Sequence, residues 1–187
     1  KNLRLLGGIP LIYHAIRAAK KADCFSEIYV NTESDVLGKR VINEGVRYYH
    51  RPYHLASDTA TNDDFVKDFL DNIGCDVVVQ LLPTSPFITA KEIREFVLEM
   101  KDESIHTLVS VRDNQIECIY NNKPINFDLK LPTPPSQEIE PIKSYACVLM
   151  GWRKNLYLHN MSHYGCAYHG GDGKTRYFTL KGFSEID

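Results

Sequence analysis

The chain has 187 residues, of which 43% are hydrophobic and 25% are charged. This composition is typical of a globular domain, and the length predicts a single one over residues 1–187. The 22 basic and 24 acidic residues give a formal net charge of −2, which argues against nucleic-acid binding by bulk positive charge. The apolar runs are far shorter than the ~20 residues of a transmembrane helix, so no membrane partner is expected either.

The five cysteines are spread at irregular intervals, without the dense pairs of a secreted disulfide scaffold. We therefore expect reduced thiols and a cytoplasmic location, and no signal peptide is visible at the start. The sequence begins at Lys1 rather than at a methionine. We expect it to be truncated at both ends relative to the natural protein.

Predicted helices and strands alternate from the start of the chain. Apolar residues recur at helical spacing over residues 9–22, which predicts the first helix. Ser34 is a suitable N-cap for a second helix, and Gly45 is a suitable end for it. Short strands are expected at 27–32 and 46–50, where β-branched and aromatic residues gather.

Two capping boxes predict the next two helices. Thr61 with Asp64 opens one helix, and Thr89 with Glu92 opens another. The stretch between these helices, residues 76–82, is almost wholly apolar. Such a run is typical of a strand that is covered on both faces, as in a parallel sheet.

A further strand is expected at 106–112. Strands separated by helices of about 10–15 residues indicate βαβ units with right-handed crossovers. The predicted fold class is therefore α/β, with helices on both faces of a mostly parallel sheet.

The pattern changes after residue 112. A hairpin is expected to turn at Asn121-Asn122, and several prolines then interrupt an extended segment. Residues 143–152 return to the character of a buried strand. We interpret residues 113–142 as a small excursion from the sheet that packs on a partner subunit, as in a homodimer.

A glycine-rich segment at 170–175 invites comparison with a phosphate-binding loop. A Walker A motif requires glycine five residues before its Gly-Lys pair, and Tyr168 occupies that position. We interpret the segment as a tight turn at Asp172-Gly173 between two strands.

A second candidate overlaps this segment. His163, Cys166, His169 and Asp172 recur at every third position, and all four side chains are acceptable zinc ligands. Structural zinc sites usually present two ligand pairs instead. The even spacing favours a loop with scattered polar residues, and zinc stays an alternative.

Polar segments follow several predicted strands and form a candidate ligand site. The Ser/Thr-rich loop at 57–62 leads into a helix N-terminus, which attracts anionic or polar groups. The segment Pro-Thr-Ser-Pro at 83–86 follows the most apolar strand, and Arg51 follows another. Because the carboxyl ends of parallel strands open into one crevice, we expect these segments to form a common rim. Lys1, just before the first helix, is suited to meet phosphate oxygens as a point charge.

Several motifs together resemble the CMP-sialic acid synthetase family, with its CMP-Kdo and CMP-pseudaminic or CMP-legionaminic acid synthetase relatives. The resemblance is firm over 1–112, looser over 113–170, and returns at the end. The matching segments are KNLRLLGGIPL (1–11), CFSEIYVNTES (24–34), RPYHLASDTATN (51–62), LLPTSPFIT (81–89) and GFSEID (182–187).

The resemblance implies a fold, a reaction and a set of site residues. It implies a three-layer Rossmann-like nucleotidyltransferase fold, in which CTP and a nine-carbon sugar acid give a CMP-sugar and pyrophosphate with Mg²⁺ as the cofactor. The implied nucleotide-binding residues are Lys1, Asn2, Arg51, Asn62 and Thr84. The implied sugar-binding residues are Ser85, Gln137 and Lys143. Lys1 and Asp187 are the implied catalytic residues, with Asp187 as the metal ligand.

The sequence also departs from the family pattern. The family opens with a strand and a phosphate-binding loop that would precede Lys1, so we expect an incomplete sheet and a half-built CTP site. Asn62 stands where serine is common, and Leu82 replaces the glutamine that usually precedes Pro-Thr-Ser-Pro. Ser136 stands in place of an arginine, and Tyr145-Ala146 in place of Asn-Gly, in the part of the fold that faces the sugar.

Two alternatives remain open at this point. The first keeps the fold and the reaction type but changes the sugar or the nucleobase, which the departures in the sugar-facing part would reflect. The second is a non-catalytic relative that binds nucleotide or acts as a scaffold.

Overall fold

The computed structural model describes residues 2–185. The helices are α1 (Leu11–Ala22), α2 (Asp35–Ile42), α3 (Asn62–Asn72), α4 (Ala90–Glu99) and α5 (Lys154–Tyr164), with short 3-10 helices η1 (Tyr53–Ala56), η2 (Ser136–Glu138) and η3 (Gly182–Glu185). The longer strands are β3 (Tyr29–Thr32), β4 (Arg47–His50), β5 (Val77–Leu81), β6 (Thr107–Asn114), β9 (Ile142–Arg153) and β10 (Thr175–Thr179). Four two-residue strands complete the set, namely β1 (Leu5–Leu6), β2 (Ile9–Pro10), β7 (Ile119–Tyr120) and β8 (Lys123–Pro124).

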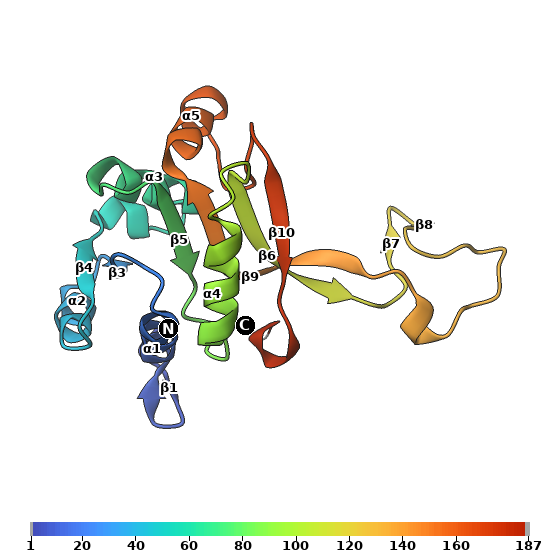
Figure 1. The fold of residues 1–187 in the computed structure, drawn as a ribbon, viewed down its shortest axis with the longest axis horizontal. Coiled ribbons are helices and arrows are strands. Elements are labelled where there is room, and N and C mark those ends of the chain that lie inside the picture. The colour runs from blue at the N-terminus through green and yellow to red at the C-terminus, as the bar shows by residue number, and fades with distance from the viewer. Residues whose placement is uncertain (1, 186–187) are drawn as a thin grey trace.

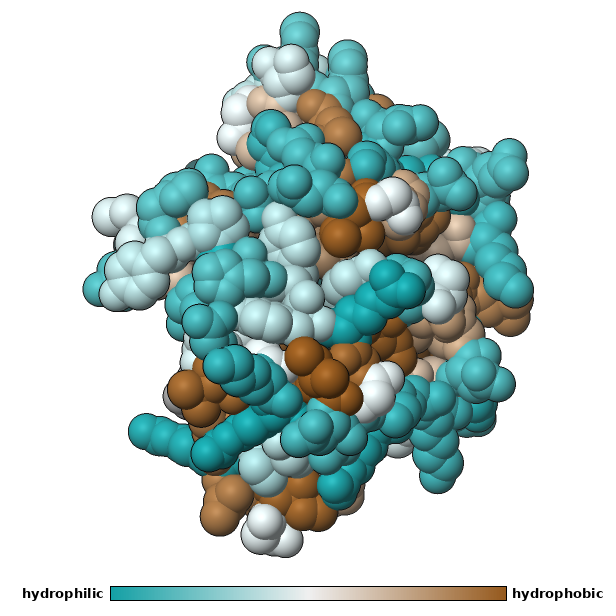
Figure 2. All heavy atoms as spheres, turned by 90° about the vertical axis from the view of Figure 1, so that its left-hand side faces the viewer, coloured by the Kyte–Doolittle hydropathy of each residue, from teal (hydrophilic) through white to brown (hydrophobic). Residues whose placement is uncertain are grey.

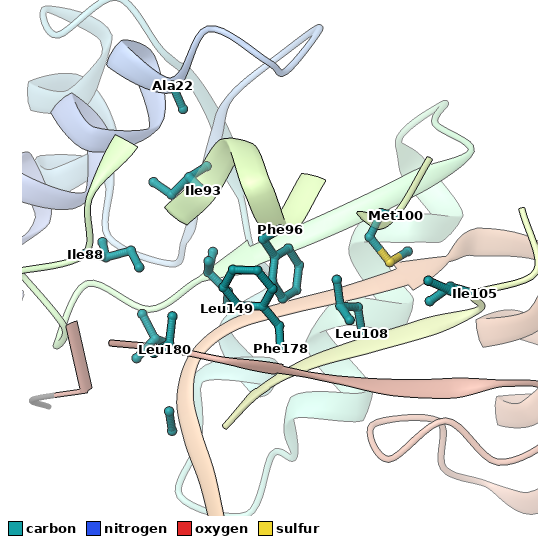
Figure 3. Packing of buried hydrophobic residues seen from close by; sticks show 12 residues of the cluster. Ala22, Ile88, Ile93, Phe96, Met100, Ile105, Leu108, Leu149, Phe178 and Leu180 are labelled. Carbon is teal, nitrogen blue, oxygen red and sulfur yellow. The ribbon is translucent and has the colours of Figure 1, made fainter. Parts of the chain in front are cut away.

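Helices cover both faces of the central sheet, which confirms the predicted α/β class with three layers (Figure 1). On one face, Ile93 and Phe96 of α4 share a buried cluster with Leu108 and Leu149 of the strands, and Ala22 of α1 lies at the edge of this cluster beyond Ile93 (Figure 3). On the other face, α3 and α5 pack on the strands through Val66, Leu70, Tyr157, Val109 and Trp152.

The main sheet is mixed, and the prediction of a mostly parallel sheet is wrong. Its strand order is β10-β6-β9-β5, and β9 runs antiparallel to both of its neighbours. The reason lies in the excursion, because the chain leaves the sheet from the end of β6 and returns from the same end as β9. The apolar run at 77–81 was expected in a parallel environment, but β5 pairs with antiparallel β9 and is only half-buried. An apolar run reports burial and carries no information about strand direction.

Strands β3 and β4 form a separate parallel pair. Within residues 2–185 no hydrogen-bonded ladder joins this pair to the four-stranded sheet. Helix α3 contacts both parts. Its Val66 and Leu70 pack on the main sheet. Its Phe69 ring lies edge-on to the rings of Tyr29 of β3 and Tyr49 of β4, with centroids 5.4 and 5.1 Å away. Side-chain packing, rather than a shared ladder, therefore connects the two sheets on this face.

The first helix begins at Leu11 rather than at residue 9, because Ile9 and Pro10 form β2, whereas the next three predicted helix N-termini are confirmed. Ser34 accepts the Leu37 N–H, and both capping boxes form with reciprocal hydrogen bonds. The second helix ends at Ile42, three residues before the expected Gly45. Gly45 instead has a φ of +73° in the turn that leads into β4.

Helix α5 was not predicted, and the segment at 170–175 follows it rather than a strand. Within α5 only Tyr157 and Asn160 are buried, so its sequence has no apolar stripe to show helical spacing. The Asn160 amide instead binds the backbone carbonyls of Gly170 and Asp172 and accepts the Asp172 N–H. This polar contact fixes the glycine-rich segment between α5 and β10.

The excursion is confirmed as a projecting arm (Figure 1). Strands β7 and β8 form the predicted hairpin, and its turn residues Asn121 and Asn122 have φ values of +49° and +60°. Two successive positive φ values are the requirement of a type I′ turn, which asparagine tolerates well.

Glu92 gives the fold a testable pH dependence. Desolvation raises the pKa of this carboxyl, but hydrogen bonds from Ser184 and Thr89 lower the pKa by more, so its pKa lies below the ordinary value. The ionised form thus stabilises the folded state at neutral pH, and this contribution is lost as the pH falls through the lowered pKa. We expect Glu92→Gln to reduce stability at about pH 7 and to have much less effect at a pH below this lowered pKa.

Urea denaturation at the two pH values measures this difference. Glu95→Gln is the matched control, because Glu95 on the same helix faces Lys91 at the surface with a 3.7 Å separation. An equal stability loss for Glu92→Gln at both pH values would contradict the assignment.

Candidate functional site

Four buried polar atoms in the described part of the chain have no hydrogen-bond partner. They are Asn31 Oδ1 on β3, Arg51 Nε just after β4, Asn62 Nδ2 at the start of α3, and Ser85 Oγ in the loop after β5. A buried polar group without a partner costs about 1–3 kcal/mol. Proteins retain such groups mainly where a ligand or water completes them. Arg51, Asn62 and Ser85 are residues of the predicted rim, which makes the rim the candidate ligand site.

Arg51 is held from two sides. Its Nη2 donates to Glu33 Oε2 at 2.9 Å, and its guanidinium lies 5.0 Å from the centre of the Phe65 ring. The hydrogen bond from Arg51 holds the pKa of Glu33 below its ordinary value. Only 17% of the Arg51 side chain is exposed, and its Nε is left free. A partly buried cation with a spare donor is suited to an anionic ligand.

Asn62 is the first residue of α3 and adjoins the same region. Its Oδ1 accepts a hydrogen bond from Gln80 Nε2 of β5 at 2.8 Å. The preceding residue, Thr61, caps the helix through the Asp64 N–H. The positive end of the helix dipole is thus directed toward the rim, where it favours an anion.

The Pro-Thr-Ser-Pro loop begins where the ladder of β5 ends. The Leu82 N–H donates to the Val148 carbonyl at 3.0 Å, which extends the pairing with β9 by one residue. Ser85 is fully buried, and its hydroxyl has no partner in the described chain. Thr84 is half-buried. The loop thus contributes the buried Ser85 hydroxyl and a half-buried threonine to the predicted rim.

The implied sugar-binding residues of the excursion lie elsewhere in this chain. Gln137 is exposed on the arm, where its carbonyl accepts a hydrogen bond from Gln115. Lys143 lies at the root of the arm, 2.6 Å from Asp113, and donates to Thr179. Figure 1 shows the arm and β4 at opposite sides of the molecule. One copy of the chain therefore does not bring Gln137 next to Arg51.

Three of the implied residues are at the ends of the sequence. Lys1 and Asp187 lie outside the described residues. Asn2 accepts the Ile12 N–H through its carbonyl at 3.1 Å, which ties it to the first turn of α1.

The zinc alternative finds no support. Among residues 2–185, no group of three or more His, Cys, Asp and Glu side chains could hold a metal ion. Asp172 instead accepts hydrogen bonds from His159 and Tyr164, and His169 contacts the Tyr145 hydroxyl. All five cysteines are free thiols.

Two surface hollows lie away from the rim. One, of about 420 Å³, is near the amino ends of β5 and β6, and its lining includes Asp76, His106 and His159. The other, of about 270 Å³, lies beside Phe25 and Arg47. Figure 2 shows the face that carries α2 and β4, where hydrophobic side chains are visible between hydrophilic ones. The buried polar atoms without partners identify the candidate site better than these hollows, because a ligand could supply the hydrogen bonds that these atoms lack.

Asp63 is a structural residue of the site that sequence analysis missed. It is the second residue of α3, and its Oδ1 accepts the backbone N–H groups of Ala167 and Tyr168 at 2.7 and 2.8 Å. The same oxygen accepts the hydroxyl of Tyr157 at 3.3 Å. Its partners lie about a hundred positions away in the chain, so no local pattern signals them.

We expect Asp63→Ala to destabilise the protein by about 1–3 kcal/mol, because it leaves the backbone N–H groups of Ala167 and Tyr168 without an acceptor at a part-buried position. Chemical denaturation measures the loss. Asp71→Ala on the same helix is the control, because Asp71 makes only an exposed ion pair with Lys67 and should cost about 0.5 kcal/mol or less. Equal effects of the two substitutions would contradict the role of Asp63.

The sequence profile of the cytidylyltransferases matches residues 1–127. The chain belongs to the cytidylyltransferase family. Among curated cytidylyltransferases, N-acylneuraminate cytidylyltransferase A of Danio rerio is 27% identical over 112 residues, which cover 59% of this chain and 26% of the relative. N-acylneuraminate cytidylyltransferase of Streptococcus agalactiae is 31% identical over 113 residues, covering 59% and 27%.

A third relative is CMP-N,N'-diacetyllegionaminic acid synthase of Legionella pneumophila, with 38% identity over 103 residues that cover 52% of this chain and 44% of the relative. The chain thus matches about a quarter to under a half of the length of these curated relatives.

Solved structures agree on the nucleotidyltransferase fold. CMP:2-keto-3-deoxy-manno-octonic acid synthetase complexed with CTP has a TM-score of 0.69 at 13% identity, covering 96% of this chain and 83% of that one. A 4-diphosphocytidyl-2C-methyl-D-erythritol synthase from Anaerococcus prevotii has a TM-score of 0.70 at 12% identity, covering 98% and 84%. At these identities the likeness shows the fold alone.

Proposed function

We propose that this chain forms part of a cytidylyltransferase that transfers CMP from CTP to a nonulosonic, sialic-acid-like sugar acid and releases pyrophosphate. The observation that carries the proposal is that Arg51, Asn62 and Ser85, three residues of the predicted rim, each have a buried polar atom without a partner, in a chain that belongs to this family. The names of the three relatives support a sugar acid of this class as the acceptor.

The chain's own residues suggest a division of roles. In the reaction, an oxygen of the sugar hydroxyl attacks the α-phosphorus of CTP, and the bond to the pyrophosphate oxygen breaks. Arg51 and the N-terminus of α3 would neutralise negative charge on the nucleotide. Asn62 and Thr84 would hydrogen-bond it, and Ser85 would face the sugar. Lys1, Asn2 and Asp187 complete the proposed set at the two ends of the sequence.

Mg²⁺ is the proposed cofactor. It commonly binds one or two protein carboxylates together with substrate phosphates and water. Among residues 2–185 no group of three or more His, Cys, Asp and Glu side chains is placed to hold a metal ion, so the described residues show no ready-made protein cage for Mg²⁺. Asp187, outside the described residues, remains the proposed ligand.

A second copy of the chain is the proposed partner of the arm. Ile119, Tyr120, Leu129 and Leu131 on the arm are each at least 66% exposed, which is unusual for large apolar side chains. Contact between two arms would also offer Gln137 to the other copy. Sedimentation of the intact natural protein tests this, and Leu129→Lys with Leu131→Lys should yield monomers. Sedimentation of the unaltered protein as a monomer would refute the dimer.

The proposed location is the cytoplasm, which suits five free thiols. Among the described residues, no helix has the length and apolar character needed to cross a membrane.

Pyrophosphate release by the intact natural protein tests the proposed function. The assay contains Mg²⁺, CTP and one of a panel of eight- and nine-carbon sugar acids, with ATP and GTP in parallel reactions. We expect release with CTP and one acid. Release with another nucleotide would favour the alternative base, and CTP binding without release with any acid would favour a non-catalytic relative.

A further inference from the structure

Gln80 and Asn62 form a side-chain pair between β5 and α3. Gln80 Nε2 donates to Asn62 Oδ1 at 2.8 Å, in a part-buried position. This bond uses the oxygen of the Asn62 amide and leaves its NH₂ group free. Asn62 Nδ2 is buried, and it has no partner among residues 2–185. The pair therefore presents a hydrogen-bond donor at the start of α3.

The surroundings of this donor indicate what it would bind. Arg51 Nε, also at the rim, is a second buried donor without a partner. The amide nitrogen of Asn62 and the guanidinium nitrogen of Arg51 can donate hydrogen bonds but cannot accept them, so both are complementary to a group rich in acceptor oxygens. The oxygens of a nucleotide, in its phosphates, ribose or base, meet this requirement.

One departure from the family pattern takes part in this hydrogen bond, and a second lies two residues along the chain from it. Leu82 stands where the resemblance places a glutamine, and Asn62 stands where serine is common. Residues two apart on a strand share a face, so Gln80 carries an amide on the same face as Leu82, about 7 Å further back. A serine hydroxyl can rotate to suit its ligand, whereas an asparagine amide has distinct donor and acceptor ends that must be oriented. Gln80 supplies this orientation.

We propose that Gln80 is a positioning residue that holds the Asn62 amide with its NH₂ toward an acceptor oxygen of the bound nucleotide. This inference rests on the proposed nucleotide site at the rim. It assigns Gln80 to the binding of CTP without contact between Gln80 and the nucleotide.

Two substitutions at Gln80 separate orientation from simple packing. Gln80→Met keeps the approximate volume and removes the hydrogen bond, so the Asn62 amide can rotate. Gln80→Glu places an acceptor-only carboxylate there, which would draw the NH₂ of Asn62 toward itself and turn Oδ1 to the ligand. We expect CTP binding to weaken about threefold to tenfold in Gln80→Met, and more in Gln80→Glu. The KM for CTP should rise with little change in kcat.

The experiment measures CTP affinity by calorimetry on the intact natural protein. It uses Gln80→Met, Gln80→Glu, Asn62→Ser and the double variant Asn62→Ser/Gln80→Met. Asn72→Ser is the matched control, because Asn72 lies at the far end of α3 and binds the Asp68 carbonyl at the surface. Thermal unfolding without nucleotide measures the folded fraction, and affinities are compared per folded molecule.

The possible outcomes distinguish the positioning role of Gln80 from the existence of the nucleotide site itself. A weaker CTP affinity in Gln80→Met that disappears in the Asn62→Ser background supports the inference, since two residues acting through one bond are not additive. An unchanged affinity in Gln80→Met, or the same loss in both backgrounds, would overturn it while leaving the nucleotide site intact. Failure of the unaltered protein to bind CTP would overturn both this inference and the proposed function.

Discussion

Arg51→Ala is expected to weaken CTP binding by about 10- to 100-fold, because charge-assisted hydrogen bonds are worth about 1.5–3 kcal/mol. Arg51 follows β4 and holds its guanidinium between Glu33 and the face of Phe65. The two contacts fix the side chain before a ligand arrives, so little conformational entropy is lost when the nucleotide binds. Removing it also leaves Glu33 without its partner, which adds repulsion toward the phosphates.

Arg47, the first residue of β4, provides a matched control. It pairs with Glu27 at 2.6 Å and lies over the ring of Tyr29 at 5.8 Å, so it repeats the contacts of Arg51. Its side chain is 64% exposed, and it occupies the opposite end of β4. We expect Arg47→Ala to leave CTP affinity unchanged. Calorimetric titration of both variants with CTP would contradict the site if their losses were equal.

Phe96→Ala is expected to destabilise the protein by about 3–5 kcal/mol, the largest effect among single substitutions in the core that we consider. Phe96 is fully buried on α4, and its ring lies edge-on to Phe178 with centroids 5.4 Å apart. A Cβ atom at Gly151 of β9 would lie 3.1 Å from the Phe96 ring, which shows how closely the helix and the strand approach (Figure 3). The cavity left by alanine could not be filled by small shifts of such a closely packed layer.

Urea denaturation measures this effect as a lower midpoint with an unchanged slope. Phe183→Ala is the control, because the Phe183 side chain is 76% exposed and contacts only the Phe87 ring among the aromatic pairs of residues 2–185. We expect a change below about 1 kcal/mol for this variant. A similar shift in both variants would mean that the layer between α4 and the sheet is not the centre of stability.

Local sequence signals predicted the elements whose causes are local. The N-caps at Ser34, Thr61 and Thr89 depend on residues three apart, and the Asn121-Asn122 turn depends on two neighbours. Helix α5 escaped prediction because its stabilising contacts come from distant parts of the chain. Its Tyr157 reaches Asp63, and its Asn160 binds the glycine-rich segment.

Some features of the candidate site could likewise be predicted from the sequence, and others could be seen only in the structure. The sequence alone predicted one rim for Arg51, the loop before Asn62, and Thr84 and Ser85, because residues that follow parallel strands gather at one edge. It could not reveal that Gln80 orients Asn62 or that Asp63 joins α3 to the segment after α5.

The sequence by itself determined the α/β class, the helix starts, the arm and the family of this protein. Only the tertiary structure decided the direction of β9, the separation of the two sheets, and the polar atoms left without partners on the rim. The physical reason is that propensity and capping act over a few residues. Strand direction and hydrogen-bond satisfaction are instead set by which distant segments meet.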